Sequence, residues 1–197
     1  MFKVLDSVCQ PTRATKYSAM VDLYAREDVV IGAGETKIVT LGVKIDIDEL
    51  DVDVNGDYKF ARRNNACDET LLRIKEQQKD NFMKTHYLEL HTRSSLRAKG
   101  LIIGVGVIDL DYPYEIGLIV HNPIKMVFIE PIEHGDEYVD VSLTGSNYGR
   151  EEVKSCGRIT IKRGDKVAQC TLVEHKGYLI GIESDVERKG GFGSSDK

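Results

Sequence analysis

The sequence of 197 residues lacks the features that place a chain in a membrane or on nucleic acid. No stretch approaches the ~20 apolar residues that span a bilayer. The N-terminal segment MFKVLDSVCQ also lacks the long apolar core of a signal peptide. A formal net charge of -5 argues against general nucleic-acid binding, because phosphate backbones are held by basic surfaces. We therefore expect a cytoplasmic protein with no membrane or nucleic-acid partner.

Cysteine and histidine are too scattered to form a metal centre. The four cysteines lack the close pairs of a zinc knuckle or a redox dithiol, and the five histidines lack the i, i+4 pair of a helical zinc site. We expect reduced structural thiols and no transition metal held by protein ligands. These residues are Cys9, Cys67, Cys156, Cys170, His86, His91, His121, His134 and His175.

What the sequence does contain is a series of short, alternating, β-branched runs separated by Gly, Asn and Asp turn signals. This pattern predicts an all-β barrel or sandwich and not alternating β and α units. With 41% hydrophobic and 30% charged residues, the composition is that of one globular domain with long insertions. The expected strands are residues 37–47, 86–91, 101–108, 115–121, 125–132, 138–143, 158–161 and 166–174.

Two polar segments, residues 49–85 and 133–157, interrupt the strand runs and are interpreted as insertions. Within the first, apolar residues alternate with charged and amide residues over positions 68–84, which predicts a single helix capped by Asp68. Its apolar positions are Leu71, Leu72, Ile74 and Phe82.

The last residues, 187–197, read ERKGGFGSSDK and have too few apolar groups to anchor themselves. We expect a mobile tail there, after a β domain that spans residues 1–186.

The most informative segment is GVGVIDLDYPYEIGLIVHN, residues 104–122, in which an apolar strand ends at two carboxylates and an aromatic ring. Taken alone, Asp109 and Asp111 would be hairpin-turn residues, although an acidic pair at a strand end costs stability unless it is solvated or used. GVID followed by Asp-Tyr, with a Gly eight residues after the first Asp, resembles the third motif of the homotrimeric dUTPases. This resemblance implies that Asp109 deprotonates the attacking water and that Tyr112 packs under the deoxyribose, where a 2'-hydroxyl would clash.

The same resemblance implies that backbone groups of the hairpin read the uracil edge in the manner of a base pair. The family usually continues with Arg-Gly where this chain has Pro113 and Tyr114, so no role is carried over to those two residues. The implied uracil-binding positions are Gly106, Val107, Ile108 and Gly117.

The segment HTRSSLRAKG, residues 91–100, resembles the second motif of the family. An Arg followed by hydroxyls suits a triphosphate, because guanidinium and hydroxyl donors can share its charge in forked hydrogen bonds. The resemblance assigns phosphate binding to Arg93, Ser94 and Ser95, which would otherwise be ordinary surface residues.

The segment PTRATKYSAMVDLYA, residues 11–25, resembles the first motif, with Met20 in the place of a common Gly. The resemblance implies that Asp22 helps to hold magnesium through water. The alternative is an ordinary turn Asp before a strand.

The segment KRGDKVAQCTLV, residues 162–173, resembles the fourth motif, in which Gln169 contacts phosphate and water. The tail resembles the fifth motif, with Arg188 for the far phosphate and Phe192 for the face of the base. Glycines allow main chain to approach phosphates closely. The remaining tail positions implied to bind substrate are Gly193 and Ser194.

Together, the five segments imply a β-clip or jelly-roll-like barrel that assembles as a homotrimer with three sites at subunit interfaces. The implied reaction is hydrolysis of dUTP to dUMP and pyrophosphate, with Asp109 as general base and Mg2+ held mainly by the substrate phosphates. In this arrangement one subunit offers Arg93, Ser94 and Gln169, a neighbour offers Asp109 and Tyr112, and the tail of the third closes over the base.

Two alternatives remain open. The dCTP deaminases share this fold and carry a segment much like residues 93–96, but the place of their catalytic Glu, two residues before an Asn, is taken by Val120. The deaminases also carry an Arg after this segment, but Arg97 of this chain lies one residue before the matching position. The other alternative is a dUTPase-fold regulatory protein that acts on a protein partner through the insertions. The insertions also suggest a phage source, which would place the protein in the host cytoplasm.

Overall fold

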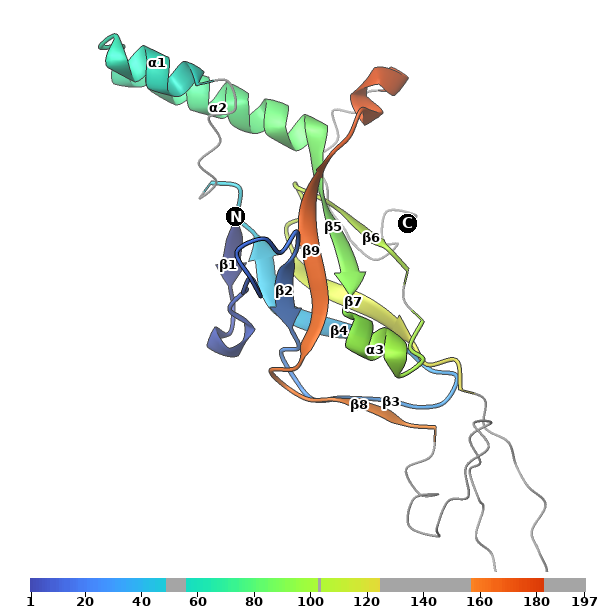
Figure 1. Cartoon of the computed structure of the whole chain (residues 1–197). Helices are drawn as coiled ribbons and strands as arrows, with labels where there is room; N and C mark the ends of the chain where they lie inside the picture. The colour runs from blue at the N-terminus through green and yellow to red at the C-terminus, as the bar shows by residue number, and fades with distance from the viewer. Residues whose placement is uncertain (49–55, 103, 125–156, 183–197) are drawn as a thin grey trace, which may run out of the picture.

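The strands of the protein form three antiparallel sheets (Figure 1). The computed structural model describes residues 1–48, 56–102, 104–124 and 157–182. One sheet has the strand order β1–β4–β7, the second β2–β9–β5–β6, and the third pairs β3 with β8. The all-β prediction is confirmed, with open sheets over these residues. The strands are β1 (Phe2–Val4), β2 (Val21–Tyr24), β3 (Val29–Ile31), β4 (Thr36–Ile45), β5 (His86–Thr92), β6 (Gly106–Asp109), β7 (Glu115–His121), β8 (Ile159–Ile161) and β9 (Lys166–Glu174).

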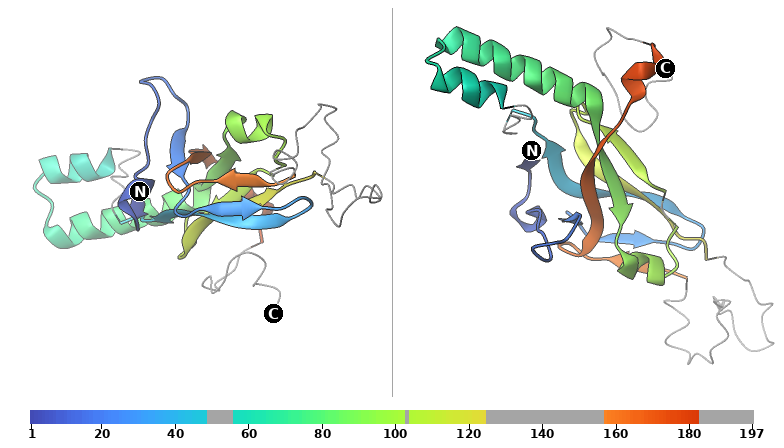
Figure 2. Two further views of the ribbon diagram at one scale, coloured as in Figure 1. Left: turned by 90° about the horizontal axis from the view of Figure 1, so that it is seen from below. Right: turned by 45° about the horizontal axis from the view of Figure 1, so that its top comes forward.

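The longest helices lie in the first predicted insertion. α1 (Asp57–Arg63) and α2 (Asp68–Thr85) pack against each other and project from the sheets as a helical hairpin (Figures 1 and 2). α3 (Ser94–Ala98) follows β5, and two short 3-10 turns, η1 (Ser7–Cys9) and η2 (Gly177–Ile180), lie near the two ends of the described chain. None of the described helices combines the length and the apolar character needed to cross a membrane.

The expected helix 68–84 is confirmed as α2, although its capping residue differs. Cys67 occupies the N-cap position, and Asp68 is the first helical residue, where a carboxylate interacts favourably with the helix dipole. The second helix of the insertion, α1, was not expected, because its seven residues bury no side chain and carry no apolar stripe.

α2 passes into β5 without an intervening loop, and several contacts fix the junction. The ring of Phe82 stacks on that of His86, with centroids 4.1 Å apart. The N–H of His175, which follows β9, donates to the carbonyl of Thr85 at 2.7 Å. The base of the helical hairpin is therefore joined to two neighbouring strands.

The expected strands 115–121 and 166–174 coincide with β7 and β9. Expected strand 101–108 is shorter, because β6 begins only at Gly106 and Ile102 makes just an isolated bridge to His121. The expected strands 125–132 and 138–143, and nearly all of the second insertion, lie outside the described residues. β1, β2 and β3 were not expected, because three or four residues are too few to show an alternating pattern.

Alternation along β5 and β7 separates a buried face from a more exposed face. Leu88, Leu90 and Thr92 of β5 are buried, whereas the residues between them are half-exposed. The buried side chains of all three sheets meet in one apolar cluster, in which each large aliphatic side chain contributes about 1.5–3 kcal/mol. This core fixes the faces on which the polar residues stand.

β4 bends at Gly42, which has a φ of +61°. The register of β4 against β7 shifts between Thr40 and Lys44, and the N–H of Gly42 donates to the carboxylate of Glu115 at 2.8 Å. A Cβ at this glycine would lie 2.5 Å from the sulfur of Cys9. Both the backbone conformation and the close approach of Cys9 therefore require glycine.

Candidate active site

A cavity of about 490 Å³ lies between β6 and β7. β6 is the outer strand of one sheet and β7 is the outer strand of another, so the connection between them spans two sheets. The open side of an edge strand presents backbone donors and acceptors. The strand edges beside this cavity therefore offer backbone hydrogen-bonding groups. The lining residues are Leu90, Ile102, Gly104, Val105, Gly106, Val107, Ile108, Tyr112, Ile116, Gly117, Leu118, Ile119 and His121.

The cavity brings together all five of the predicted hairpin contacts. At one of them, Gly106, an added Cβ would lie 3.2 Å from the Cβ of Leu90, so glycine allows β6 to approach β5 closely. Among the described residues that line the cavity, Tyr112 and His121 alone bring polar side-chain atoms to an otherwise apolar surface. The five predicted residues are Gly106, Val107, Ile108, Tyr112 and Gly117.

Asp109 and Tyr112 stand at the turn between the two strands. Asp109 is exposed at the end of β6, whereas Tyr112 is 8% exposed. The N–H of Tyr112 donates to the carbonyl of Asp109 at 3.1 Å, which closes the turn. Tyr114 packs edge-on against Tyr112, with ring centroids 5.7 Å apart. The unusual residue Tyr114 therefore supports the ring that is predicted to contact the sugar.

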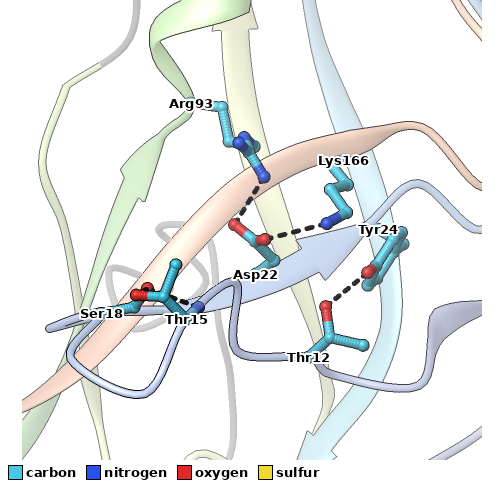
Figure 3. A network of polar contacts seen from close by, with 7 residues as sticks. All are labelled: Thr12, Thr15, Ser18, Asp22, Tyr24, Arg93 and Lys166. Atoms are coloured by element: carbon cyan, nitrogen blue, oxygen red, sulfur yellow. Dashed lines mark hydrogen bonds and ion pairs between the residues drawn. The ribbon is translucent and has the colours of Figure 1, made fainter.

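A second polar group lies where β2, β9 and the start of α3 meet (Figure 3). The carboxylate of Asp22 is almost fully buried, and its Oδ1 lies 2.7 Å from Nη1 of Arg93. The Nη1 atom is buried and this contact has the geometry of an ion pair without that of a hydrogen bond. Lys166 donates to Oδ2 of Asp22 at 3.2 Å. One buried carboxylate thus holds two cationic side chains.

Gln169 belongs to the same group by strand register. It faces Asp22 of β2 on one side and His91 of β5 on the other. The N–H of Arg93 donates to the carbonyl of Val167 at 3.1 Å, which fixes Arg93 at the end of β5. The predicted phosphate-binding residues Arg93 and Gln169 are therefore brought together, with Ser94 and Ser95 exposed in α3.

A row of polar side chains on β5 connects the two groups. Glu89 accepts hydrogen bonds from the hydroxyl of Tyr87, at 3.0 Å, and from the imidazole of His91. These bonds, from His91 first and then Tyr87, hold the pKa of Glu89 below its usual value, and the bond to Glu89 raises the pKa of Tyr87. In the strand register, Tyr87 lies opposite Asp109 of β6, and His91 lies opposite Gln169 of β9.

Within one chain, the two groups lie far apart. Arg93 follows Tyr87, the register partner of Asp109, by six residues. An extended strand rises 3.2–3.4 Å per residue, so Asp109 and Arg93 are separated by roughly 20 Å along β5. A single subunit therefore does not place Asp109 and Arg93 on the same phosphate group.

Solved structures of dUTPases superpose on this chain. No protein-family model matches the sequence, and no curated protein matches it. A mutant dUTPase from phage phi11 of S. aureus has a TM-score of 0.53 and 18% identity, and the match covers 98% of each chain. The dUTPase of Staphylococcus bacteriophage 80alpha has a TM-score of 0.52 and 18% identity, covering 98% of this chain and 97% of that one. This chain has the dUTPase fold.

Asp22 is the residue predicted to help hold magnesium through water. Over the described ranges, no group of three or more His, Cys, Asp or Glu side chains is placed to hold a metal ion. The two oxygens of Asp22 face Arg93 and Lys166, so its carboxylate is suited to a metal-bound water and not to direct ligation. Mg2+ beside phosphates commonly keeps several waters. The role predicted for Asp22 stays a prediction.

Sequence reasoning missed two residues of the dUTPase-fold site. Lys166 lies three residues before Gln169 in the fourth motif, and its charge beside a predicted phosphate contact was the available signal. His121 lines the cavity and contacts the hydroxyl of Thr36 at 3.0 Å through Nδ1. The predicted tail residues Arg188, Phe192, Gly193 and Ser194 lie outside the described residues.

Proposed function

We propose that this protein hydrolyses dUTP to dUMP and pyrophosphate at sites shared between the subunits of a homotrimer. The observation that carries the proposal is the cavity between β6 and β7, which gathers the five predicted hairpin residues and has Asp109 at the turn beside it. Uracil is flat, with alternating donors and acceptors along one edge. The outer edges of the two strands offer backbone groups for that edge, and the apolar lining offers contacts for its faces.

Tyr112 selects the sugar in this proposal. Its buried ring, supported by Tyr114, forms a firm surface beside the cavity. A deoxyribose packs on such a surface, whereas the extra 2'-hydroxyl of a ribose would be pressed against the ring without a hydrogen-bond partner. Leaving a polar group unpaired in this way gives strong discrimination.

Asp109 acts as the general base. It accepts a proton from a water whose oxygen forms a bond to the α-phosphorus, while the bond from that phosphorus to the bridging oxygen breaks and pyrophosphate leaves. Magnesium, when bound with the phosphates, would neutralise their charge and arrange the α-phosphorus for in-line attack. The other contributions of the chain are positioning and electrostatic stabilisation.

Arg93, Ser94, Ser95 and Gln169 bind the phosphates from a neighbouring subunit. Arg93 and Asp109 are separated by roughly 20 Å along β5, which supports a shared site. To any one site, a subunit can supply either the residues for the base and sugar or the residues for the phosphates. Among the similar structures, the 80alpha dUTPase is known with the analogue dUpNHpp, and the phi11 mutant enzyme with a structural Mg(II) ion. The C-terminal tail completes the proposed site, with Arg188 and Phe192 over the far phosphate and the base.

A dCTP deaminase is disfavoured by the structure. Val120, which stands where that enzyme needs a glutamate, is fully buried in the core. The residues that line the described cavity include no carboxylate that could move protons at the base. Asn122 is buried as well and donates to the carbonyls of Ile31 and Gly157, which is a structural role.

The test is pyrophosphate release from dUTP, compared with dCTP, dTTP and UTP, in the presence of Mg2+. We expect dUTP to be hydrolysed far faster than the other three. Ammonia release from dCTP would instead identify a deaminase. A chain that releases neither product would support the regulatory alternative, in which the helical hairpin serves a protein partner.

A further inference from the structure

Arg93, Asp22 and Lys166 form a small charge cluster with one excess positive charge. They come from three separate elements: Asp22 from β2, Lys166 from β9 and Arg93 from the junction of β5 and α3 (Figure 3). Asp22 has a side chain that is only 5% exposed, against 27% for Arg93 and 44% for Lys166. The anion is therefore the most buried member of the cluster, and the side chains of both cations are partly exposed.

A buried carboxylate is stable only while a cation remains beside it. If the guanidinium of Arg93 turned from Asp22 to a phosphate and no other cation were near, the carboxylate would be left buried and uncompensated. This free-energy cost would weaken phosphate binding. Lys166 removes this cost, because its ammonium already lies 3.2 Å from the second carboxylate oxygen.

The contacts of Lys166 and Arg93 are consistent with Lys166 remaining beside Asp22 while Arg93 binds a phosphate. The ammonium of Lys166 lies 5.7 Å from the centre of the Tyr24 ring, whose hydroxyl is in turn hydrogen-bonded to Thr12 at 2.5 Å. The Nη1 atom of Arg93 contacts Asp22 without hydrogen-bond geometry, so this contact is not one arm of a forked pair. Lys166 holds Asp22 by a hydrogen bond from its ammonium, whereas the ion pair of Arg93 lacks one.

We propose that Lys166 is a positioning residue for phosphate binding, which acts by keeping Asp22 paired while Arg93 engages the triphosphate. This inference rests on the proposed function, in which Arg93 binds phosphate. Lys166 does not contact the substrate. It lowers the cost of releasing the guanidinium from its buried partner.

The test measures dUTP hydrolysis and, by calorimetry with Mg2+, the binding of dUpNHpp and of inorganic tripolyphosphate. Lys166→Met should raise KM for dUTP about tenfold and weaken both ligands similarly, while kcat changes by less than about threefold. Lys166→Arg should restore binding, because it returns a cation to Asp22. Lys176→Met is the matched control, since Lys176 is exposed beyond the opposite end of β9 and should behave as wild type.

A double-mutant cycle separates indirect from direct action. In an Asp22→Asn background there is no carboxylate to compensate, so Lys166→Met should cause no further loss. If Asp22→Asn does not fold, the same cycle can be measured with Arg93→Ala. In the Arg93→Ala background, Lys166→Met should leave ligand affinity unchanged. An equal loss in the wild-type and mutant backgrounds, or wild-type affinity in Lys166→Met, would overturn the inference.

The outcomes also separate this inference from the proposed function. A wild-type chain that binds tripolyphosphate in a Lys166-dependent way but releases no pyrophosphate from dUTP refutes the function and leaves the positioning role intact. A chain that hydrolyses dUTP with normal KM in Lys166→Met refutes only the positioning role. A chain that binds neither ligand overturns both.

Discussion

Asp109 is exposed at the end of β6, two residues before a second exposed aspartate, Asp111. If Asp109 is the general base, Asp109→Asn should lower kcat by on the order of 10²–10⁴, because the base acts at the transition state. Binding of dUpNHpp should remain close to wild type. The control is Asp111→Asn, which removes the same charge from the same turn. Equal losses in the two variants would remove Asp109 from its special role.

Tyr112 offers a second test at the level of single residues. Tyr112→Ala should chiefly weaken discrimination against UTP, because the surface that excludes the 2'-hydroxyl is lost. Tyr112→Phe keeps the ring and should keep the discrimination. The measurement is the ratio of kcat/KM for dUTP and UTP in each variant. A truncated side chain that still excludes UTP would show that the sugar is read elsewhere.

Substitutions at Gly42 and Gly34 distinguish two costs of placing a side chain in a turn, namely backbone strain and a steric clash. Both have positive φ, of +61° and +70°. Gly42→Ala adds a clash with Cys9 to the backbone strain and should destabilise the protein by about 3 kcal/mol or more. Gly34→Ala meets nothing within 4 Å among the described residues and should cost only about 1 kcal/mol. Urea unfolding measures both, and equal losses would contradict the role assigned to Cys9.

The elements show why the sequence predicted some parts of the fold and not others. β7 and β9 are long enough for alternation to locate both ends. α3 has only five residues, which is too few for a helical period of apolar residues to show. The site motifs were found by resemblance, and each one alone has an ordinary reading as a turn, a surface segment or a flexible tail. The pairing of Asp22 with Lys166 depends on the register of β2 against β9, which is a long-range property.

The helical hairpin is the element least connected to the predicted chemistry. Leu72 of α2 is 58% exposed and Phe60 of α1 is 71% exposed, so part of its apolar surface faces solvent in the single chain. Replacing residues 51–84 with a short Gly-Ser turn should leave a folded enzyme with near-normal dUTP hydrolysis if the hairpin is peripheral. Light scattering should then report the proposed trimer unchanged. Dissociation into smaller species would show instead that the hairpin builds the interface.

At the scale of the whole molecule, a shared site predicts complementation between inactive chains. Arg93→Ala and Asp109→Asn should each abolish most activity, since each damages one half of every site. Mixed trimers contain some sites in which an intact phosphate half meets an intact base half. After subunit exchange, demonstrated with a mass-tagged chain, the mixture should therefore exceed either parent in pyrophosphate release. Exchange without any gain would contradict the shared site.

The loop-free passage from α2 into β5 has a mechanical consequence. A helix rises 1.5 Å per residue, so the rod formed by the 18 residues of α2 is about 27 Å long. Its base is clamped by the Phe82–His86 stack and by the bond from His175 to Thr85, so it has no hinge about which to swing freely. A force on the tip of the hairpin would therefore act directly on β5, which β6 and β9 hold on its two sides. The other end of that strand precedes Arg93, so the hairpin and the arginine lie at opposite ends of one strand.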